Sequence, residues 1–368
     1  MTRSRHHGGE AAGGILFFGG YDPSYPRNAI IRKGWRALGF PVAECRAGER
    51  LKVHFRYPAL LARYARMRDS SPILFVPEFR HKDVPLAWMI ARCSGKRLVF
   101  DPLVSRYETR VLDRGDVLRG SPQSAHNRNV DAVSLRLADL VLADTQAHAR
   151  FFAREFGIEP AKIRVLPVGF DEDLFVEAPL PAARSVFEIL FYGTYLPLHG
   201  VDTIVEAASL LRGSPVHFTL VGTGQTFASI EERVALLPEG LVDFRPPTPV
   251  EELPALIASA DVVLGVFGGT PKAEMVVPNK LFQALAVGRP VITGDTPAVR
   301  ELFQSGVHLL SVPPGDGCAL AAEIERVRSD APMRQRLARA GGSFTRGEFN
   351  SRRIAERLAA IFEEAGLL

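Results

Sequence analysis

The stretch at residues 278–293, PNKLFQALAVGRPVIT, joins a helix to a strand with almost no loop between them. Pro278 suits the first turn of a helix, and Gly288 suits its C-terminal end. Residues 291–293 are a short apolar run of the kind found in parallel strands that are buried on both faces. A helix that leads directly into such a strand is the repeating unit of a doubly wound α/β sheet.

The same alternation extends outward along the whole chain. Apolar runs predict strands at residues 15–18, 73–76, 98–100, 140–143, 163–166, 189–192, 218–221, 262–266 and 291–293. Helical patterns fall at about 27–39, 57–68, 84–94, 124–137, 145–156, 202–212, 226–237, 251–259, 278–287 and 317–328. Residues 176–188 contain two prolines and no apolar periodicity, which predicts a linker. The 368 residues therefore fit two Rossmann-like domains.

The composition is that of a globular protein, with 46% hydrophobic and 23% charged residues. Cys45, Cys93 and Cys318 are far apart, which excludes a disulfide framework and a cysteine zinc site and fits a reducing cytosol. Residues 1–180 carry 28 Lys and Arg against 20 Asp and Glu, and residues 181–368 carry 17 against 21. The basic half is expected to face an anionic partner: nucleic acid, a membrane surface or a phosphorylated substrate.

No targeting or membrane-spanning segment is predicted. Glu10 and several glycines interrupt the start of the chain, so residues 1–14 are expected to be a disordered leader and not a signal peptide. No run approaches 18 apolar residues. These features predict a cytoplasmic protein.

Candidate site residues are those that directly follow a strand, because open α/β sheets bind ligands beyond the carboxyl ends of their strands. Gly19 and Gly20 follow the first strand and let the backbone approach an anion, or else form a tight turn. The loop at residues 193–202, GTYLPLHGVD, suits a diphosphate, with His199 donating to a phosphate oxygen. The alternative is that Asp202 or Thr203 caps the helix and His199 is a surface residue.

Two later segments add candidates. Gly222 and Gly224 follow a strand, but Phe227 stands where the dinucleotide fingerprint has its third glycine, so contact with a sugar or phosphate fits better than a nicotinamide site. Lys280 and Gln283 share a face near a helix N-terminus, where a cation and an amide suit a diphosphate and a ribose. The alternative makes both ordinary solvated side chains.

Taken in order, the glycine-rich first loop, GTYLPLHG, LVGTG and PNKLFQALAVGRPVI resemble the group 1 glycosyltransferases, family 4, of GT-B fold. The resemblance runs from about residue 15 to the last helix. It implies two Rossmann-like domains facing a central cleft: an acceptor-binding domain at residues 1–178, a nucleotide-sugar-binding domain at 186–345, and a helix at 346–368 that crosses back to the first domain. It also implies a nucleoside-diphosphate sugar as the donor substrate and retention at the anomeric carbon, with no metal and no cofactor.

The resemblance also implies roles on the donor side. Lys280 neutralises the leaving phosphate, helped by His199, which stands where the family often has lysine. Gln283 replaces the second glutamate of a paired-glutamate motif and meets the ribose. Met275 stands where that motif has its first glutamate, so the neighbouring Glu274 is only an approximate substitute for this glutamate. The implied donor-binding residues are Gly193, Thr194, Tyr195, Gly200, Gly222, Gly224, Glu274, Asn279 and Gln283.

The first domain is expected to bind the acceptor. Asp101 follows a strand where many relatives have a histidine, and its carboxylate is a candidate to accept the proton of the acceptor hydroxyl. The alternative is a cap or turn residue before Pro102. The predicted catalytic residues are thus Asp101, Lys280 and His199. Acceptor contacts are assigned to Gly19, Gly20, Arg106 and His81, although a lone histidine is more often structural.

Residues 54–68 show a basic amphipathic pattern, with Leu60, Leu61, Tyr64 and Met67 on one face and Arg56, Arg63, Arg66 and Arg68 beside it. This pattern predicts contact with an anionic membrane, and so an enzyme on its inner face that acts on an acceptor glycan or lipid-linked intermediate. The alternative is a helix that packs on its own sheet.

Nucleic acid is not an expected partner, because no recognised binding module is present. The competing functions are a nucleotide-sugar epimerase and a noncatalytic nucleotide-sugar-binding protein.

Overall fold

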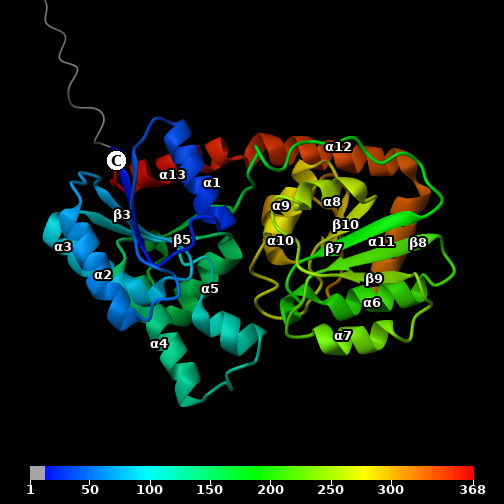
Figure 1. Ribbon diagram of the computed structural model, residues 1–368, viewed down its shortest axis with the longest axis horizontal. Coiled ribbons are helices and arrows are strands. Elements are labelled where there is room, and N and C mark those ends of the chain that lie inside the picture. The colour runs from blue at the N-terminus through cyan, green and yellow to red at the C-terminus, as the bar shows by residue number, and fades with distance from the viewer. Residues whose placement is uncertain (1–12) are drawn as a thin grey trace, which may run out of the picture. The chain divides into compact units, whose positions relative to one another are not determined.

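The computed structural model describes residues 13–368, so most of the predicted leader lies outside the described residues. The described chain divides into two compact units (Figure 1). The N-terminal unit comprises residues 13–111, Val117–Gly169 and Ser351–Leu368. The C-terminal unit comprises Leu112–Asp116 and Phe170–Asn350.

The N-terminal unit is built on a parallel sheet with the strand order β2-β1-β3-β4-β5-β6. Its strands are β1 (Ile15–Gly19), β2 (Val42–Arg46), β3 (Ile73–Val76), β4 (Arg97–Phe100), β5 (Leu140–Ala143) and β6 (Ile163–Val165). Its helices are α1 (Pro26–Ala37), α2 (Val53–Arg66), α3 (Val84–Ser94), α4 (Pro122–Leu137), α5 (Gln146–Phe156) and α13 (Ser351–Glu364). The strands β1, β3 and β5 are buried along their whole length, which explains their unbroken apolar sequences.

The C-terminal unit has a second parallel sheet with the order β12-β11-β10-β7-β8-β9. Its strands are β7 (Phe187–Tyr192), β8 (Val216–Val221), β9 (Val242–Arg245), β10 (Val262–Leu264), β11 (Val291–Gly294) and β12 (Leu310–Val312). Its helices are α6 (Val201–Leu210), α7 (Phe227–Val234), α8 (Leu253–Ser259), α9 (Asn279–Ala286), α10 (Pro297–Leu302), α11 (Gly317–Ser329) and α12 (Ala331–Glu348). The helix and strand predicted at residues 278–293 are α9 and β11.

The sequence did not predict three of the strands, and all three lie at sheet edges. Strand β2 carries Glu44 and Arg46 and is only partly buried, and β9 (VDFR) alternates between half-buried and exposed residues. Strand β12 has three residues. An edge strand needs no continuous apolar run, because one side of it meets solvent or a loop.

The last helix, α13, lies along α1 in the N-terminal unit (Figure 1). A Cβ on Gly34 of α1 would stand 2.0 Å from the carbonyl oxygen of Ser351, so the missing side chain allows the close approach. Arg289, which precedes β11, donates to the carbonyl oxygens of two residues of the predicted linker, Ala178 (3.3 Å) and Pro179 (2.5 Å). These bonds hold the linker to the C-terminal unit. Across residues 13–368, no helix has the length and apolarity needed to cross a membrane.

Candidate functional site

The loops after β7 and β8 interlock at the carboxyl edge of the C-terminal sheet. A Cβ on Gly222 would lie 2.0 Å from the carbonyl oxygen of Gly193, and a Cβ on Gly224 would lie 2.6 Å from the backbone nitrogen of Tyr195. The Tyr195 N–H donates to the carbonyl of Thr223 at 2.9 Å. The glycines predicted for ligand approach are therefore needed first for the approach of one loop to another.

Lys280 lies in the first turn of α9 and points to these loops. Its side chain is buried, its Nζ stands 4.0 Å from the centre of the Phe191 ring, and no hydrogen-bond partner for Nζ exists among the described residues. Burial lowers the pKa of Lys280 to about 7. The alternative of a solvated lysine is wrong, and an unpaired buried ammonium is a strong signal for an anionic ligand.

His199 lies beside Lys280 at the end of the 3₁₀ turn Pro197–His199. Its Nδ1 hydrogen-bonds the carbonyl oxygen of Thr194, so Nδ1 carries the proton and Nε2 is an acceptor in the neutral ring. Burial, and then the charge of Lys280, lower the pKa of His199 well below its usual value. The surface alternative is wrong. The prediction of a cation that donates to phosphate also needs correction, because the ring is neutral with Nε2 as an acceptor.

Gln283 is buried one turn after Lys280. Its side-chain oxygen lies 3.1 Å from the hydroxyl of Tyr192, which is also 3.2 Å from the carbonyl oxygen of Lys280. Tyr192 therefore orients the amide that was predicted to meet a ribose. The alternative of an ordinary surface glutamine is wrong.

The remaining donor-side predictions divide into exposed and buried groups. Thr194 and Glu274 are exposed, Asn279 is half-buried as the first residue of α9, and Gly200 packs against the backbone of residues 267–268. Tyr195 is a correction, since its ring is fully buried at 5.4 Å from the Phe227 ring. It contributes backbone atoms to this edge and not its side chain.

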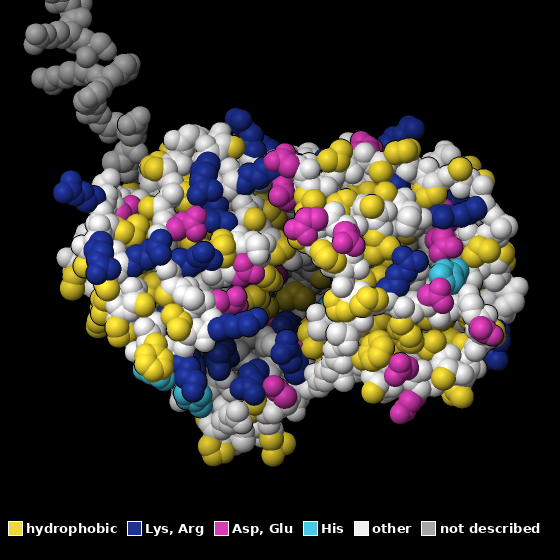
Figure 2. All heavy atoms as spheres, viewed as in Figure 1, with side chains coloured by type: hydrophobic (Ala, Val, Ile, Leu, Met, Phe, Trp, Pro, Cys, Tyr) yellow, Lys and Arg dark blue, Asp and Glu magenta, His cyan; other side chains and the backbone are white. Residues whose placement is uncertain are grey.

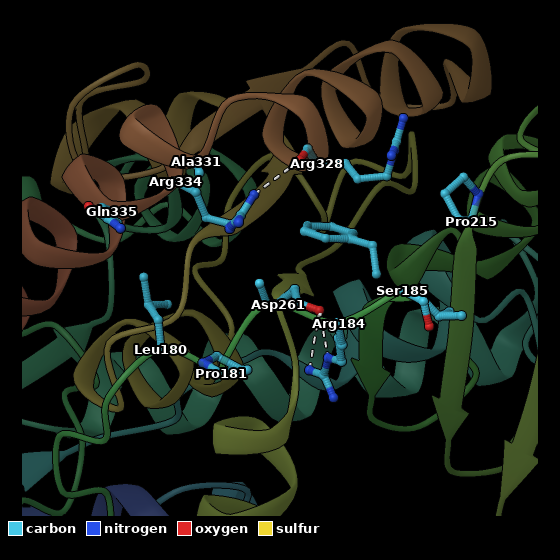
Figure 3. A pocket seen from close by; sticks show the side chains of 13 residues that line it. Leu180, Pro181, Arg184, Ser185, Pro215, Asp261, Arg328, Ala331, Arg334 and Gln335 are labelled. Atoms are coloured by element: carbon cyan, nitrogen blue, oxygen red, sulfur yellow. Dashed lines mark hydrogen bonds and ion pairs between the residues drawn. The ribbon is translucent and has the colours of Figure 1, made fainter.

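A separate pocket of about 290 Å³ lies at the opposite edge of the same sheet (Figure 3). It is lined by Phe187, Asp261 and Arg334, among others, at the amino ends of the strands. None of the predicted site residues lines it.

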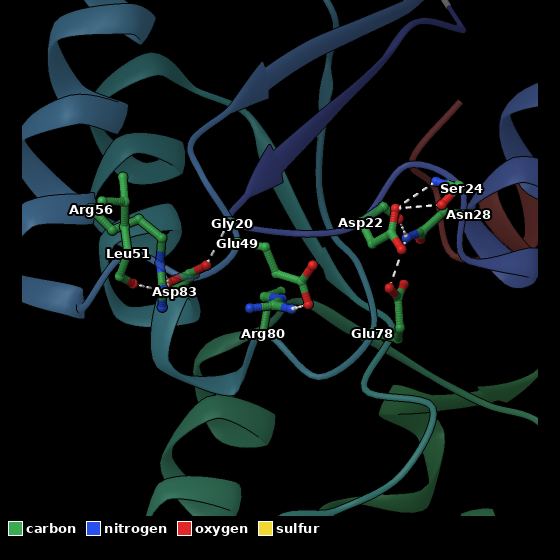
Figure 4. Close-up of polar contacts among 10 residues, drawn as sticks. All are labelled: Gly20, Asp22, Ser24, Asn28, Glu49, Leu51, Arg56, Glu78, Arg80 and Asp83. Atoms are coloured by element: carbon green, nitrogen blue, oxygen red, sulfur yellow. Dashed lines mark hydrogen bonds and ion pairs between the residues drawn. The ribbon is translucent and has the colours of Figure 1, made fainter. Parts of the chain in front are cut away.

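In the N-terminal unit, the loop after β1 is held by an ion pair (Figure 4). Asp83 accepts from the Gly20 N–H at 2.9 Å and pairs with the Arg56 guanidinium at 2.6 Å. A Cβ on Gly19 would lie 3.0 Å from the Asp83 carboxylate. The prediction that Gly19 and Gly20 bind a ligand is corrected, since the Gly20 N–H is already bonded, and the missing side chains make room for Asp83 at Gly19 and for Arg56 at Gly20.

Asp101 is also a correction. It is fully buried after β4, and its Oδ2 accepts from Arg27 Nε at 2.6 Å, with the Arg27 side chain equally buried. Burial raises the pKa of Asp101, and Arg27 opposes this shift. The carboxylate is neither a cap nor an open base but half of an internal ion pair that Arg27 extends to the Leu166 carbonyl.

His81 is buried, and its Nε2 lies 3.5 Å from the carboxylate of Asp131. Both ring nitrogens are buried without a hydrogen bond within residues 13–368, and the ring stands edge-on to Phe100 at 5.0 Å. Burial, and then Arg106, lower the pKa of His81 to about 3, so the ring is neutral. Arg106 itself is half-buried and donates to Asn127 at 3.0 Å, which leaves it a candidate for the acceptor.

Two buried groups at this edge were missed by the sequence analysis. Glu78 follows β3, and its Oε1 accepts from Asn28 at 2.7 Å while its Oε2 is buried without a partner among the described residues (Figure 4). Burial, and then Asp101, raise the pKa of Glu78 to about 8. His148 lies between Asp144 (2.7 Å) and Glu108 (2.8 Å), and these carboxylates raise its pKa to about 10 against the effect of burial.

The backbone is strained next to these groups. Phe79 and Leu103, which follow β3 and β4, have φ values of 59° and 60°, unusual for residues with a side chain. The Phe79 N–H donates to the Pro102 carbonyl, and the exposed Phe79 ring lies edge-on to Tyr25 at 5.3 Å. Strain of this kind clusters at functional sites. Within residues 13–368, no group of three or more His, Cys, Asp or Glu side chains is arranged to hold a metal ion.

Residues 186–330 match the family model described as glycosyl transferases group 1. This segment is similar to a group 1 glycosyltransferase domain. The chain is 29% identical over 249 residues to a D-inositol 3-phosphate glycosyltransferase of Geodermatophilus obscurus, covering 62% of this chain and 53% of that protein. It is 26% identical to a putative colanic acid biosynthesis glycosyltransferase of Salmonella typhimurium, covering 57% and 53%. The chain thus spans about half the length of the curated relatives it matches.

Solved structures confirm the GT-B fold that the resemblance implied for this chain. Anabaena HepE, in complex with UDP and glucose, matches with a TM-score of 0.70 at 17% identity over 96% of this chain and 99% of that one. Sucrose-phosphate synthase from Thermosynechococcus elongatus matches with a TM-score of 0.72 at 18% identity over 95% and 98%.

Proposed function

We propose that the protein is a retaining glycosyltransferase that moves a sugar from a nucleoside-diphosphate sugar to a hydroxyl of a glycan precursor. The observation that carries the proposal is the buried, unpaired ammonium of Lys280 at the N-terminus of α9, beside the Gly193 loop. A diphosphate supplies the negative charge that this site lacks. UDP-sugars are the first donors to test, because HepE was solved with UDP and UDP-glucose.

The donor-side geometry fits assistance to a leaving group. As the bond between the anomeric carbon and the diphosphate oxygen breaks, negative charge grows on the diphosphate. Lys280 and the N–H groups of the first turn of α9 stabilise this charge, and they do so strongly because the site is buried. The acceptor oxygen bonds to the anomeric carbon on the same face, and its proton passes to the departing diphosphate. The transfer then needs no protein nucleophile, no metal and no cofactor.

The acceptor side of the proposal belongs to the N-terminal unit. Asp101 is paired with Arg27, so the groups that we assign to the acceptor are Glu78, Phe79 and Arg106. A protonated Glu78 both donates to and accepts from a sugar hydroxyl. The relative named for colanic acid biosynthesis supports a polysaccharide precursor, free or lipid-linked, as the acceptor. We propose the cytoplasm, at the inner face of a membrane, as the place of action.

The test incubates the purified protein with UDP-, GDP- and ADP-glucose, with and without a panel of sugar and lipid-linked acceptors. We expect slow donor hydrolysis alone and transfer with one acceptor class, both strongly reduced in Lys280→Met and unchanged in Lys162→Met, a control on the other unit. Conversion of the donor to its epimer without an acceptor would identify an epimerase. Donor binding without hydrolysis or transfer would identify a noncatalytic binding protein. Either of these results overturns the proposal.

A further inference from the structure

The N-terminal unit has an apolar pocket of about 470 Å³ between three of its helices. A pocket of this size holds a small molecule. Side chains of α2, α3 and α4 form its walls, among them Val53, Tyr57, Pro85, Val130 and Val133. His81, in the 3₁₀ turn before α3, also lines it. Glu78, Phe79 and Arg106, the groups assigned to the acceptor, do not line it, and the donor groups belong to the other unit.

The pocket is poor in charge, although the surface of the unit is rich in basic side chains. Figure 2 shows Lys and Arg side chains beside hydrophobic ones on the visible face of this unit. Among the described residues that line the pocket, Lys82 is the only one with a charged side chain, because the His81 ring is neutral. Apolar walls hold a ligand by removing its carbon surface from water, so the ligand must offer an apolar body.

The His81 ring brings unused hydrogen-bonding atoms to this apolar pocket. Its side chain is 2% exposed, and neither Nδ1 nor Nε2 has a hydrogen-bond partner among the described residues. The carboxylate of Asp131 approaches Nε2 only to 3.5 Å, and its Oδ1 is likewise buried without a hydrogen bond in the described chain. Buried polar atoms are normally paired, because an unpaired one has lost its bonds to water without replacement. His81 is therefore suited to pair with a molecule bound in the pocket.

The chemistry of the pocket selects among possible ligands. A neutral imidazole has one N–H donor and one acceptor nitrogen, and a hydroxyl pairs with either of them. A charged group would be desolvated between apolar walls, and a sugar or a diphosphate would lose the water around many polar atoms and find partners for few of them. A plain hydrocarbon chain would leave His81 unpaired. The ligand that fits is a small apolar body with one hydroxyl.

We propose that this pocket binds a compact, uncharged aromatic or alicyclic alcohol, with its hydroxyl hydrogen-bonded to His81 and its ring against Val130 and Val133. The site takes a different class of molecule from the nucleotide sugar and from the glycan acceptor. It is linked to the acceptor groups through Asp131, which lies beside His81 and accepts from the backbone N–H of Tyr107 at 2.8 Å. The inference goes beyond the transfer reaction and does not depend on it.

Ligand-observed NMR titration of the full chain with 4-ethylphenol tests this pocket, and ethylbenzene provides the same ring without the hydroxyl. We expect saturable binding of 4-ethylphenol and about tenfold weaker binding of ethylbenzene, because only the phenol pairs with His81. His81→Phe keeps a flat ring edge-on to Phe100 and should bind the phenol about tenfold more weakly than wild type, with no loss of ethylbenzene binding. Its midpoint of urea unfolding should not fall, since the substitution removes unpaired buried nitrogens.

A second variant tests the walls of the pocket. Val133 is 48% exposed, so Val133→Asp places a charge at the pocket without burying it in the core. It should weaken the binding of both probes. The matched control is Val176→Asp, the same change at a valine that is 61% exposed and does not line the pocket. This control should bind both probes as wild type does.

Four results would each overturn the proposal: no saturable binding of 4-ethylphenol, equal affinity for ethylbenzene, unchanged phenol affinity in His81→Phe, or an equal loss in Val133→Asp and Val176→Asp. Incubation with UDP-glucose then separates a free ligand from an acceptor. The phenol should stay unmodified, and its glucosylated product in a mass spectrum would place the pocket in the acceptor site and contradict a separate one. If the probes bind as expected but no donor is hydrolysed, the transfer reaction fails and the pocket stands.

Discussion

The ammonium of Lys280 occupies the space that a side chain at residue 193 would need. A Cβ on Gly193 would lie 2.9 Å from Lys280 Nζ, and 3.5 Å from Cε1 of His199. The loop after β7 and the first turn of α9 therefore form one site. The glycine is required because it leaves room for the cation.

Gly193→Ala should displace Lys280 as well as strain the backbone. The φ of Gly193 is 148°, so an added Cβ is expected to cost about 1–3 kcal/mol of unfolding free energy. The matched control is Gly213→Ala, where φ is 94° and nothing lies within 4 Å of an added Cβ. Urea unfolding should show a loss in both variants. Titration with UDP should show weaker binding in Gly193→Ala alone, and equal affinities would contradict a role for this contact.

UDP binding should take up a proton through Lys280. The pKa of Lys280 is about 7 in the free protein, and a bound diphosphate raises it, because an anion favours the charged form. The affinity for UDP should therefore fall by up to tenfold per pH unit above about pH 7. Calorimetry in two buffers of different ionisation enthalpy measures the uptake. Lys280→Arg stays charged and should lose the pH dependence, and a wild type without proton uptake at pH 8 would count against the assignment.

Asp101→Asn should destabilise the N-terminal unit and not act as the loss of a base. The substitution leaves the buried Arg27 guanidinium without its counter-charge, which we expect to cost about 3–5 kcal/mol of unfolding free energy. Arg27→Met with Asp101→Leu removes both charges and should recover much of that loss. Denaturant unfolding checks both. A stable Asp101→Asn variant with a lost alkaline or acidic limb in its pH–rate profile would restore Asp101 as a proton acceptor.

Glu78→Gln should change how stability depends on pH. The folded-state pKa of Glu78 is about 8, above its unfolded value, so its carboxyl stabilises the fold at low pH and this contribution is lost as pH rises through about 8. Glu78→Gln stays neutral and should gain stability relative to wild type between pH 5 and pH 9, by at most about 5 kcal/mol. Urea unfolding at pH 5, 7 and 9 measures this gain. The exposed Glu49→Gln is the control, and parallel curves for Glu78→Gln and wild type would contradict the shift.

The central strands of both sheets were predictable because they are buried on both faces and so must be apolar throughout. The runs at residues 73–76 and 140–143 are β3 and β5. Edge strands such as β2 were not predicted from the sequence, because they lack a continuous apolar run. Glu44 of β2, for example, hydrogen-bonds Tyr21 and Arg32 and needs no apolar neighbour. Helix α12 was also not predicted, because Gly341 and Gly342 lower the helix propensity of this segment. A Cβ on Gly341 would lie 2.1 Å from the His308 carbonyl oxygen, so packing selects the glycine there.

The donor-side candidates were found from local rules, since each follows a strand or begins a helix. The same rules did not predict whether these side chains are charged or neutral. Whether Lys280 and His199 are solvated or buried depends on Phe191 and on the Thr194 carbonyl, which adjacent sequence does not reveal. In the N-terminal unit the same local rule failed, because Asp83 and Arg27 come from other segments and take up the Gly20 N–H and the Asp101 carboxylate.

The sequence by itself determined the doubly wound architecture, the order of its elements and the loops that carry the donor-side residues, since periodicity and glycine placement are local properties of the chain. Only the tertiary structure decided which charges are paired. Asp101 and Asp83 form ion pairs with arginines, while Glu78 and Lys280 form none among the described residues. The protonation state of a side chain depends on the charged and hydrogen-bonding groups around it and on its burial from water. Neither can be read from the residues next to it in the sequence.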